Sequence, residues 1–292
     1  MTAQKPAWEE RLAGWLFTLL PHHFLSRAVF HLTRLKNPLV TPAIRWFIRS
    51  FNVDMADAEQ QDPKVFKTFN EFFVRSLTPE ARPIAAGNKL LASPVDGTVS
   101  QCGVIAHDHL FQAKGQCYSV EDLLGGEPLL AKLFSGGQFA TIYLAPYNYH
   151  RIHMPLSGRL KKMIHIPGRL FSVAPWTVQT VPRLFARNER LVCLFTTAAG
   201  PMAMVLVGAI NVAAIETVWS GLVTPPSGKT ISHFDYDHTA KDFNKGDEMG
   251  RFNMGSTVIL LTTAQVEWAA HLKPDQTLRM GEEIGSFSLP NG

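Results

Sequence analysis

The longest uncharged stretch of the chain lies between Arg190 and Glu216, and it limits the folds that the sequence can adopt. Its 25 residues invite interpretation as a membrane-spanning helix, which needs roughly 20 apolar residues. However, residues 196–201 in the middle read TTAAGP, which is a turn signal. The turn leaves two short apolar segments, residues 191–196 and 202–207, typical of buried β-strands. The sequence therefore predicts a buried hairpin and no membrane span here.

Short β-rich segments separated by Gly, Pro and Asn continue through the C-terminal part of the chain. Residues 140–144 and 258–262 are two more clear candidate strands. A short repeat supports this interpretation, because GDEMGRF at residues 246–252 is echoed by GEEIGSF at residues 281–287, and both look like a turn that leads into a strand. We expect an α+β fold in which residues 67–292 form a mostly antiparallel β-sandwich or barrel.

The N-terminal part differs, because its apolar side chains recur at helical spacing. Three stripes are present, at residues 12–20, 25–32 and 44–51, and prolines separate them. None is long enough to span a bilayer, but aromatic and leucine faces flanked by arginine are typical of helices that lie in a membrane interface. A core-facing role is the ordinary alternative for any one amphipathic helix. We expect residues 1–66 to form a helical membrane-association region.

The net charge of +4 is distributed unevenly. Residues 1–50 carry a balance of +5 and residues 157–190 a balance of +6, and such patches favour an anionic partner, either nucleic acid or a lipid surface. The three cysteines lack CxxC spacing, which indicates a reducing compartment and no disulfide framework. The first residues show neither a signal peptide nor a transit peptide, so we expect a bacterial-type cytoplasm.

Four polar clusters in the β-rich part contain the residue types that catalysis uses. They are SPVDGT around Asp96, HRIH from His150 to His153, FDYDH at residues 234–238, and MGST around Ser256. An Asp, a His and a Ser from separate segments can form a triad, in which Asp orients His and His activates the serine hydroxyl. Taken alone, each residue has an ordinary explanation, since an Asp before a Gly commonly caps a turn.

A metal site at His150 and His153 is the competing interpretation, because His is the commonest metal ligand. In an extended segment an offset of three sends the two rings to opposite faces. Neither an HExxH motif nor a cysteine partner is present. The sequence therefore predicts no metal.

Together the clusters resemble the phosphatidylserine decarboxylase family. The resemblance covers residues 68–287 and is carried by TFNEFFVRSLTPEARPI, SPVDGT, YHRIHMP, PGRLFSV, LFARNER, IETVWSG and FNKGDEMGRFNMGST. The helical N-terminus resembles that of the longer bacterial members. The family segment usually reads LGST, and here Met254 replaces the leucine, a change that nearly preserves side-chain volume.

The resemblance implies a proenzyme that cuts its own Gly255–Ser256 bond. Ser256 Oγ attacks the carbonyl carbon of Gly255, where the missing side chain leaves the approach open, and an ester forms. Elimination of the carboxylate from Ser256 gives dehydroalanine, and hydrolysis releases ammonia and leaves a pyruvoyl group on residues 256–292. The serine is consumed to make this covalent cofactor, so no external cofactor is expected.

The resemblance also implies that the pyruvoyl group forms a Schiff base with phosphatidylserine and withdraws electrons during decarboxylation to phosphatidylethanolamine. It assigns Asp96 and His153 to maturation and His150 to decarboxylation. The expected partners are phosphatidylserine, the anionic surface on the cytoplasmic face of the bacterial membrane, and each cleaved chain for the other. No nucleic-acid partner is expected, and the sequence leaves open whether the chain forms a homodimer.

A membrane-associated Ser/His/Asp hydrolase is the alternative enzyme, since it uses the same three residue types and keeps its serine. Such an enzyme normally presents the serine in a GxSxG elbow between a strand and a helix, and MGSTV lacks the second glycine. A basic membrane scaffold without activity explains the N-terminus but leaves Asp96, the histidines and the Gly-Ser pair unexplained.

Overall fold

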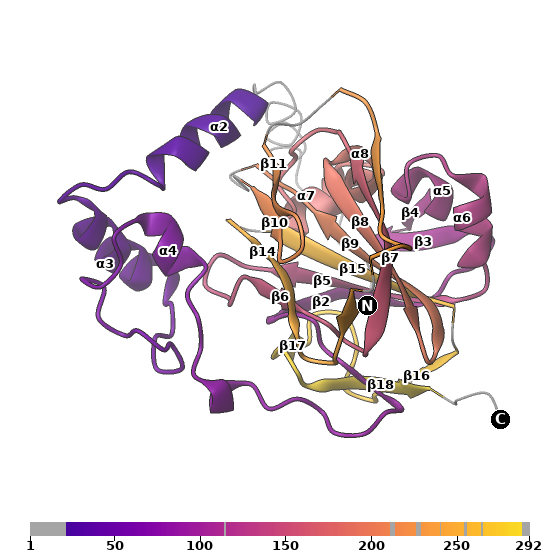
Figure 1. Ribbon diagram of the computed structural model, residues 1–292. Coiled ribbons are helices and arrows are strands. Elements are labelled where there is room, and N and C mark those ends of the chain that lie inside the picture. Colours follow the sequence, from indigo (N-terminus) through magenta and orange to yellow (C-terminus); the bar gives the residue numbers. More distant parts are fainter. Residues whose placement is uncertain are drawn as a thin grey trace.

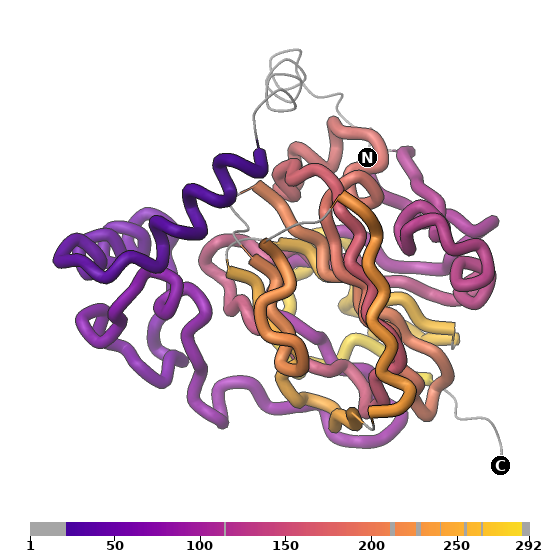
Figure 2. Tube along the Cα trace, turned by 45° about the horizontal axis from the view of Figure 1, so that its top comes forward, coloured from indigo at the N-terminus to yellow at the C-terminus, as the bar shows by residue number. Residues whose placement is uncertain are grey.

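The computed structural model describes the chain except for residues 1–21, 114, 211–213, 226–228, 240, 254–255, 264 and 288–292. The described residues form a β-rich body with a helical region at one side, drawn in indigo and purple (Figures 1 and 2). The predicted helix at residues 12–20 and the candidate cleavage residue Gly255 lie outside the described residues.

The largest sheet of the described residues contains nine strands and carries most of the core. In spatial order they are β12 (Ser232–Asp235), β7 (Gly158–Ile166), β8 (Arg190–Thr197), β9 (Gly200–Val207), β15 (Ser256–Thr262), β5 (Gln138–Leu144), β2 (Gly97–Val104) and β17 (Thr277–Leu278), with β13 (Asp242–Phe243) also paired to β7. Neighbouring strands are antiparallel. In the described part of the chain the order has two ends, so the sheet is open and not a closed barrel.

Smaller sheets pack around it (Figure 1). One has the order β11 (Gly221–Thr224), β10 (Ile215–Thr217), β14 (Glu248–Phe252) and β6 (Arg151–His153), and another has β1 (Leu90–Ala92), β18 (Glu283–Phe287) and β16 (Val266–Trp268). A hairpin joins β3 (His109–Ala113) and β4 (Gln116–Ser119). The short helices of this body are α5 (Val120–Leu123), α6 (Pro128–Leu133), α7 (Pro175–Thr180) and α8 (Leu184–Arg187).

The strands expected from apolar segments are confirmed. The uncharged stretch forms the β8–β9 hairpin, with Thr197 opposite Gly200 at its turn. β15 is buried at all seven positions. β9 and β5 pair with its two edges, and the consecutive residues 258–261, which point alternately to the two faces of the sheet, all lie in the hydrophobic core. A strand covered on both faces has no solvent-facing side, which explains why its sequence is a continuous apolar run without polar alternation.

The two copies of the short repeat are also confirmed as turns that lead into strands, β14 and β18. Gly246 and Gly281 have φ values of +89° and +86°, a region in which glycine is favoured. Both lie against Ile84, and an added Cβ would come within 2.9 Å of that side chain at each glycine. The repeat therefore provides two equivalent turns that both pack against Ile84, which is partly buried.

The helical region contains α2 (His22–Leu32), α3 (Val40–Phe51), α4 (Phe69–Phe73) and the 3-10 turn η1 (Pro79–Ala81). The second and third predicted stripes are confirmed as α2 and α3. The inner face of α3, with Ile44 and Phe47, packs on Phe72 and Phe73 of α4 in a second hydrophobic core. This core continues past residue 66, where the sequence placed the boundary of the helical region. No helix in the described residues is long and apolar enough to cross a bilayer.

The second basic segment, residues 157–190, is partly neutralised within the fold. Arg159, Lys161 and Arg183 form ion pairs with acidic side chains. Arg190 is buried and donates to backbone carbonyls. The segment's other basic side chains, Lys162, Arg169 and Arg187, form no ion pair within the described residues, and the same holds for Arg27, Lys36, Arg45 and Arg49 of the helical region.

Candidate active site

Ser256 is the first residue of β15, where that strand enters the centre of the large sheet. It pairs with Leu144 of β5, whereas the pairing of β15 with β9 begins only at Thr257. The side chain is fully buried, and its Oγ has no hydrogen-bond partner among the described residues. A buried hydroxyl without a partner costs stability and calls for a functional explanation.

His150 is fully buried just before β6. Its Nδ1 lies 2.8 Å from the carbonyl oxygen of Asn148, which can only accept, so the hydrogen-bond network assigns the ring proton to Nδ1. Nε2 then carries a lone pair and has no partner among the described residues. Burial lowers the pKa of His150 to about 3, which keeps the imidazole neutral.

Two chain connections place His150 and Ser256 in one neighbourhood. The amide of Phe252, at the end of β14, donates to the carbonyl of His150 at 3.0 Å, and the chain reaches Ser256 soon afterwards. On the other side, Leu144 pairs with Ser256, and the segment after it leads to His150. The ring of Phe73 packs on the His150 ring at a centroid distance of 4.2 Å.

His153 lies at the end of β6 and is bound at both ring nitrogens. Nδ1 lies 2.8 Å from the carbonyl oxygen of Gly246, which places the proton on Nδ1. Nε2 therefore accepts from the hydroxyl of Tyr149 at 3.1 Å. Burial lowers the pKa of His153 and raises that of Tyr149 to about 12, so both groups are neutral near pH 7.

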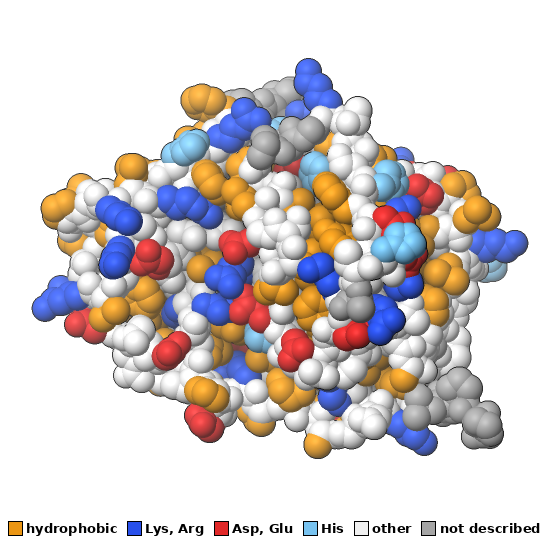
Figure 3. All heavy atoms as spheres, viewed as in Figure 1, with side chains coloured by type: hydrophobic (Ala, Val, Ile, Leu, Met, Phe, Trp, Pro, Cys, Tyr) orange, Lys and Arg blue, Asp and Glu red, His pale blue; other side chains and the backbone are white. Residues whose placement is uncertain are grey.

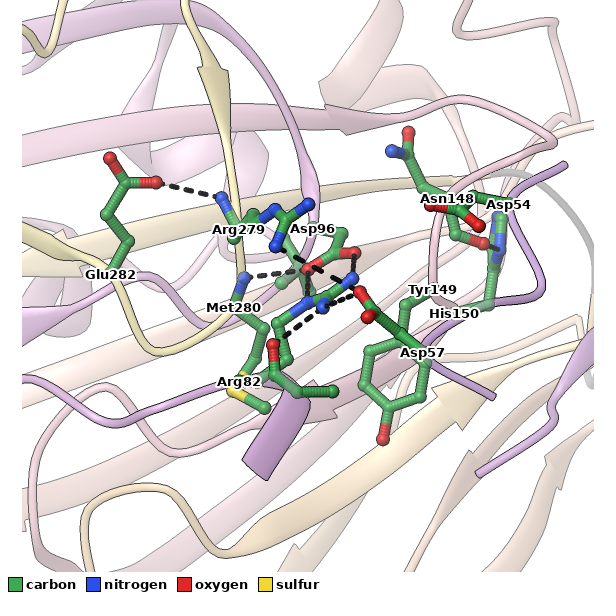
Figure 4. Close-up of polar contacts among 12 residues, drawn as sticks. Asp54, Asp57, Arg82, Asp96, Asn148, Tyr149, His150, Arg279, Met280 and Glu282 are labelled. Carbon is green, nitrogen blue, oxygen red and sulfur yellow. Dashed lines mark hydrogen bonds and ion pairs between the residues drawn. The ribbon is translucent and has the colours of Figure 1, made fainter. Parts of the chain in front are cut away.

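Asp96 lies in the bend before β2, and its carboxylate is held by Arg82 (Figure 4). Arg82 donates to both oxygens, at 2.8 and 2.6 Å, and the amide of Met280 donates to Oδ1 at 2.8 Å. Arg82 also binds Asp57 at 2.7 Å, so a bridging arginine joins two carboxylates. An arginine that donates to both oxygens of one carboxylate, as Arg82 does to Asp96, makes one of the stronger polar contacts found in proteins.

This arrangement differs from the triad expected from the sequence, in which Asp96 orients a histidine. Both ring nitrogens of His153 are engaged by Gly246 and Tyr149, and the carboxylate of Asp96 is engaged by Arg82 and Met280. The link is instead made by the backbone, because the amide of His153 donates to the carbonyl of Pro94 at 2.8 Å, two residues before Asp96. Asp96 thus anchors the bend on which His153 rests.

Sequence reasoning missed Arg82, Tyr149 and Phe73 as site residues. Arg82 and Phe73 lie in TFNEFFVRSLTPEARPI, which was used only to show the resemblance. Nothing in the local pattern shows that this segment crosses from the helical region to the bend at Asp96. Tyr149 directly precedes His150, and its position beside the two histidines was the one available signal.

The site therefore combines a buried serine hydroxyl, two neutral histidines and a clamped carboxylate, which are the groups of an enzyme that uses a serine as its reactive group. Comparison with known proteins identifies the family. The family model described as Phosphatidylserine decarboxylase matches residues 69–286, and a second one described as PSD matches residues 11–52. The chain belongs to the phosphatidylserine decarboxylase family.

Similar curated proteins carry the name phosphatidylserine decarboxylase proenzyme. That from Shewanella frigidimarina is 52% identical over 270 residues, which is 90% of this chain and 94% of the relative. Those from Alkalilimnicola ehrlichii and Azotobacter vinelandii are 52% identical over 275 and 276 residues, or 92% and 93% of this chain and 96% of each relative. The resemblance noted from the sequence motifs is thus confirmed, and with it membership of an enzyme family.

The low pKa of His150 predicts a specific pH dependence of stability. In the unfolded chain the imidazole binds a proton below about pH 6.5, whereas in the folded chain it stays neutral until about pH 3. The unfolded state therefore binds more protons in this window, and stability falls as the pH drops through it. Between pH 8 and pH 5, His150 should cost about 2 kcal/mol of the free energy of unfolding.

Urea unfolding of wild type and His150→Gln at both pH values tests this expectation. The variant should lose about 2 kcal/mol less than wild type on acidification. His153 has a pKa lowered in the same direction, but it titrates in both proteins and cancels in the difference. His238→Gln, which changes an exposed histidine, is the matched control and should behave as wild type. Equal losses in wild type and His150→Gln would contradict the neutral, buried imidazole.

Proposed function

We propose that the chain decarboxylates phosphatidylserine to phosphatidylethanolamine after it cuts its own Gly255–Ser256 bond. The observation that carries the proposal is the Oγ of Ser256 at the start of a central strand, which is fully buried and finds no hydrogen-bond partner in the described part of the chain. The names of the relatives support it, since a proenzyme is a precursor that needs processing. Ser256 leads into a strand, so the strand-to-helix elbow of the alternative hydrolase is not formed.

The position of Ser256 fits the pyruvoyl group that the proposal requires. That group would supply a ketone that withdraws electrons from the bound amino acid, a service no ordinary side chain provides. The buried surroundings of Ser256 exclude water, and exclusion of water strengthens electrostatic effects and protects reactive groups. The unpartnered Oγ also lacks a competing hydrogen bond that an attack on Gly255 would have to break.

The fold supports continued association of the two chains after cleavage. The fragment of residues 256–292 contains β15, which pairs with β5 and β9 in the middle of the large sheet. It also contains β18, which pairs with β1 from the N-terminal chain. Removing β15 would split the core of the sheet, so we expect residues 1–255 and 256–292 to remain one molecule.

In this proposal His153 is the base that activates Ser256 during maturation. Its proton is on Nδ1, so Nε2 carries the lone pair that a base needs. The hydroxyl of Tyr149 donates a hydrogen bond to this lone pair, and the bond must break before Nε2 can accept a proton from Ser256. Asp96 acts as a positioning residue, because the bend that it anchors to Arg82 and Met280 supports the backbone of His153.

His150 delivers a proton to the α-carbon of the substrate in this proposal. As folded, the imidazole is neutral and its unpartnered Nε2 carries no proton, so it must first gain one. A negative charge close to the ring raises a histidine pKa, and the carboxylate of the substrate brings such a charge. The burial of His150 thus keeps it neutral in the free enzyme, and its Nε2 lone pair can accept the proton that the substrate ammonium must lose before its nitrogen can act as a nucleophile. His150 would then pass this proton to the α-carbon after CO2 has left.

The first test concerns the origin of the cofactor. Ser256→Ala should remain one chain of 292 residues and be inactive, because the attacking hydroxyl is missing. Wild type should yield a fragment of residues 256–292 without a free N-terminal amine, measured by mass spectrometry. Thr257→Val is the matched control, since Thr257 is also fully buried and its hydroxyl has no partner among the residues that the structure describes, and this variant should still be cleaved. A fragment that begins with an unmodified serine would contradict the proposed conversion of Ser256 into a pyruvoyl group.

A second test separates the two histidines. His153→Ala and Asp96→Ala should slow cleavage by at least about 100-fold, because general base catalysis contributes on the order of 10² to 10⁴ in rate. His150→Ala should be cleaved and acquire a blocked fragment, yet release little phosphatidylethanolamine. Processing is followed on denaturing gels and product by lipid chromatography. The roles must be exchanged if His150→Ala stays intact while His153→Ala matures.

We also propose that the helical region binds an anionic membrane surface and places the enzyme on the cytoplasmic face of the bacterial membrane. The outer faces of α2 and α3 and their connection expose large apolar side chains, at Phe24, Leu32, Leu35, Leu39, Trp46 and Phe51. Basic side chains without ion pairs lie among them, and Figure 3 shows both kinds over the helical region. Apolar burial and attraction to anionic lipid are the two terms that hold interfacial helices.

The membrane proposal is tested at the exposed face rather than by deleting the region. A deletion of residues 1–51 would also remove Ile44 and Phe47 from the second core and disturb the fold. The double variant Leu39→Ser with Trp46→Ser changes side chains that are 73% and 65% exposed. It should weaken sedimentation with phosphatidylserine vesicles by at least about tenfold, because each side chain contributes roughly 1.5–3 kcal/mol when buried.

The matched control for vesicle binding lies on α6, on the opposite side of the β-rich body (Figure 1). Leu129 is 85% exposed there, and Leu133 is exposed beside it. Leu129→Ser with Leu133→Ser should bind vesicles as wild type does. Equal binding by both double variants and wild type would exclude α3 as the membrane contact.

A further inference from the structure

A pocket with a volume of about 160 Å³ lies beside the candidate active site. Asp96 lines it, and so do Asn148 and Tyr149, the two residues that precede His150. Three arginines also line it, namely Arg75, Arg82 and Arg279. Figure 4 shows Arg82, Asp96 and Arg279 together, with Asn148 and Tyr149 nearby.

Two of these arginines already have carboxylate partners. Arg82 binds both Asp96 and Asp57. The Arg279 side chain is largely exposed, and its guanidinium lies 4.0 Å from Asp57. Neither cation therefore has to be neutralised by a ligand.

Arg75 is different, because it is buried and unpaired. Its exposed fraction is 5%. Within the described residues its guanidinium, including the buried Nε, makes neither a hydrogen bond nor an ion pair, and its Cζ lies over the ring of Phe72 at 5.4 Å from the ring centroid. Burial lowers the pKa of Arg75 to about 10, which still leaves it a cation near pH 7. A buried charge without a partner is strongly unfavourable in a folded protein.

The nearby carboxylates do not remove this cost by direct contact. Asp96 and Asp54 both favour the charged form of Arg75 electrostatically. However, both oxygens of Asp96 are bound by Arg82, and Oδ1 of Asp54 accepts from the amide of Ala56. The forked guanidinium of Arg75 therefore stays available to a planar or tetrahedral anion in the pocket.

The backbone around Arg75 is held rigidly. Arg151, on β6 between the two histidines, donates to the carbonyl of Val74 at 2.9 Å and to the hydroxyl of Ser76 at 2.6 Å. These are the residues on either side of Arg75. The same segment carries Phe73, whose ring packs on His150. Arg75 and His150 are therefore positioned by one short stretch of chain, with the pocket beside them.

We propose that Arg75 binds the phosphodiester of the phospholipid headgroup. This inference rests on the proposed function and specifies how the substrate is held. The carboxylate of the substrate is the other candidate anion, but it is lost as neutral CO2 during decarboxylation, so its negative charge does not stay at that position. A cation that held that carboxylate would stabilise the substrate more than the transition state and slow the reaction. The phosphodiester keeps its charge throughout and is close to the α-carbon, so it can be held while His150 acts.

The test measures binding without chemistry, in the Ser256→Ala chain, so that neither maturation nor decarboxylation affects the readout. Short-chain phosphatidylserine and short-chain phosphatidylethanolamine are titrated separately, because both carry the phosphodiester and only the first carries the carboxylate. Adding Arg75→Gln should raise the Kd for both lipids by a similar factor of about 10 to 100, the range expected for a charged hydrogen bond. Arg159→Gln is the matched control, since Arg159 is 52% exposed and paired with Asp242, and its Kd values should not change.

Two outcomes overturn the proposal. Unchanged Kd values for both lipids would show that Arg75 binds no headgroup, and a loss confined to phosphatidylserine would assign it to the carboxylate. Thermal unfolding checks that Arg75→Gln is folded, and inorganic phosphate should raise the Tm of the parent chain more than that of the variant. If Arg75→Gln does not fold, Arg75→Lys is used for the same binding test. It keeps the positive charge but loses the guanidinium that donates two parallel hydrogen bonds, so it should bind both lipids about tenfold more weakly. An inactive wild type would refute the proposed function while leaving this binding result valid.

Discussion

The pairing of β15 with β5 and β9 is the constraint on which the rest of the structure depends. β5 pairs with the strand from Ser256 onward and β9 from Thr257 onward, so the start of β15 is placed at a fixed position inside the molecule. Ser256 is fully buried there, and its hydroxyl has no partner among the described residues. The same pairing would hold residues 256–292 in place after the proposed cut before Ser256. One set of strand pairings thus positions the buried serine and is compatible with the proposed cleavage of the chain.

Burial also decides the electrostatics around Ser256. His150 and His153 each direct a protonated Nδ1 at a backbone carbonyl, and this leaves a lone pair on each Nε2. Their low pKa values follow from desolvation, so both rings are neutral before a substrate arrives. The charged groups of the site are concentrated instead in the Arg82 bridge between Asp96 and Asp57 and at Arg75. The site thus contains two neutral histidines, the paired cation of Arg82, and the cation of Arg75, which has no ion pair among the described residues. This arrangement is suited to bind an anionic headgroup.

The helical region is joined to the site through α4 and the residues after it. Phe72 and Phe73 pack with α3 in the second core, while Phe73 also contacts His150. The outer face of α3 exposes Trp46, and the inner face supports the segment that carries Arg75. The surface proposed to touch lipid and the residue proposed to hold the headgroup are therefore both connected to the second hydrophobic core, in which α3 packs on Phe72 and Phe73.

The sequence alone predicted the elements whose signals are local. The β8–β9 hairpin, the buried strand β15, the paired turns at Gly246 and Gly281, and the helices α2 and α3 each follow from apolar spacing or a turn signal within a few residues. Family motifs marked Asp96, His150, His153, Gly255 and Ser256 as candidates. Asp96, His150 and Ser256 are buried and His153 is partly buried, whereas Gly255 lies outside the described residues. The tertiary structure alone decided the partners of the charges. Asp96 binds Arg82 in place of a histidine. Arg159, Lys161 and Arg183 pair with acidic residues far away in the sequence, and Arg75 has no ion pair within the described residues. Ion pairing depends on which side chains meet after folding and leaves no periodic pattern along the chain.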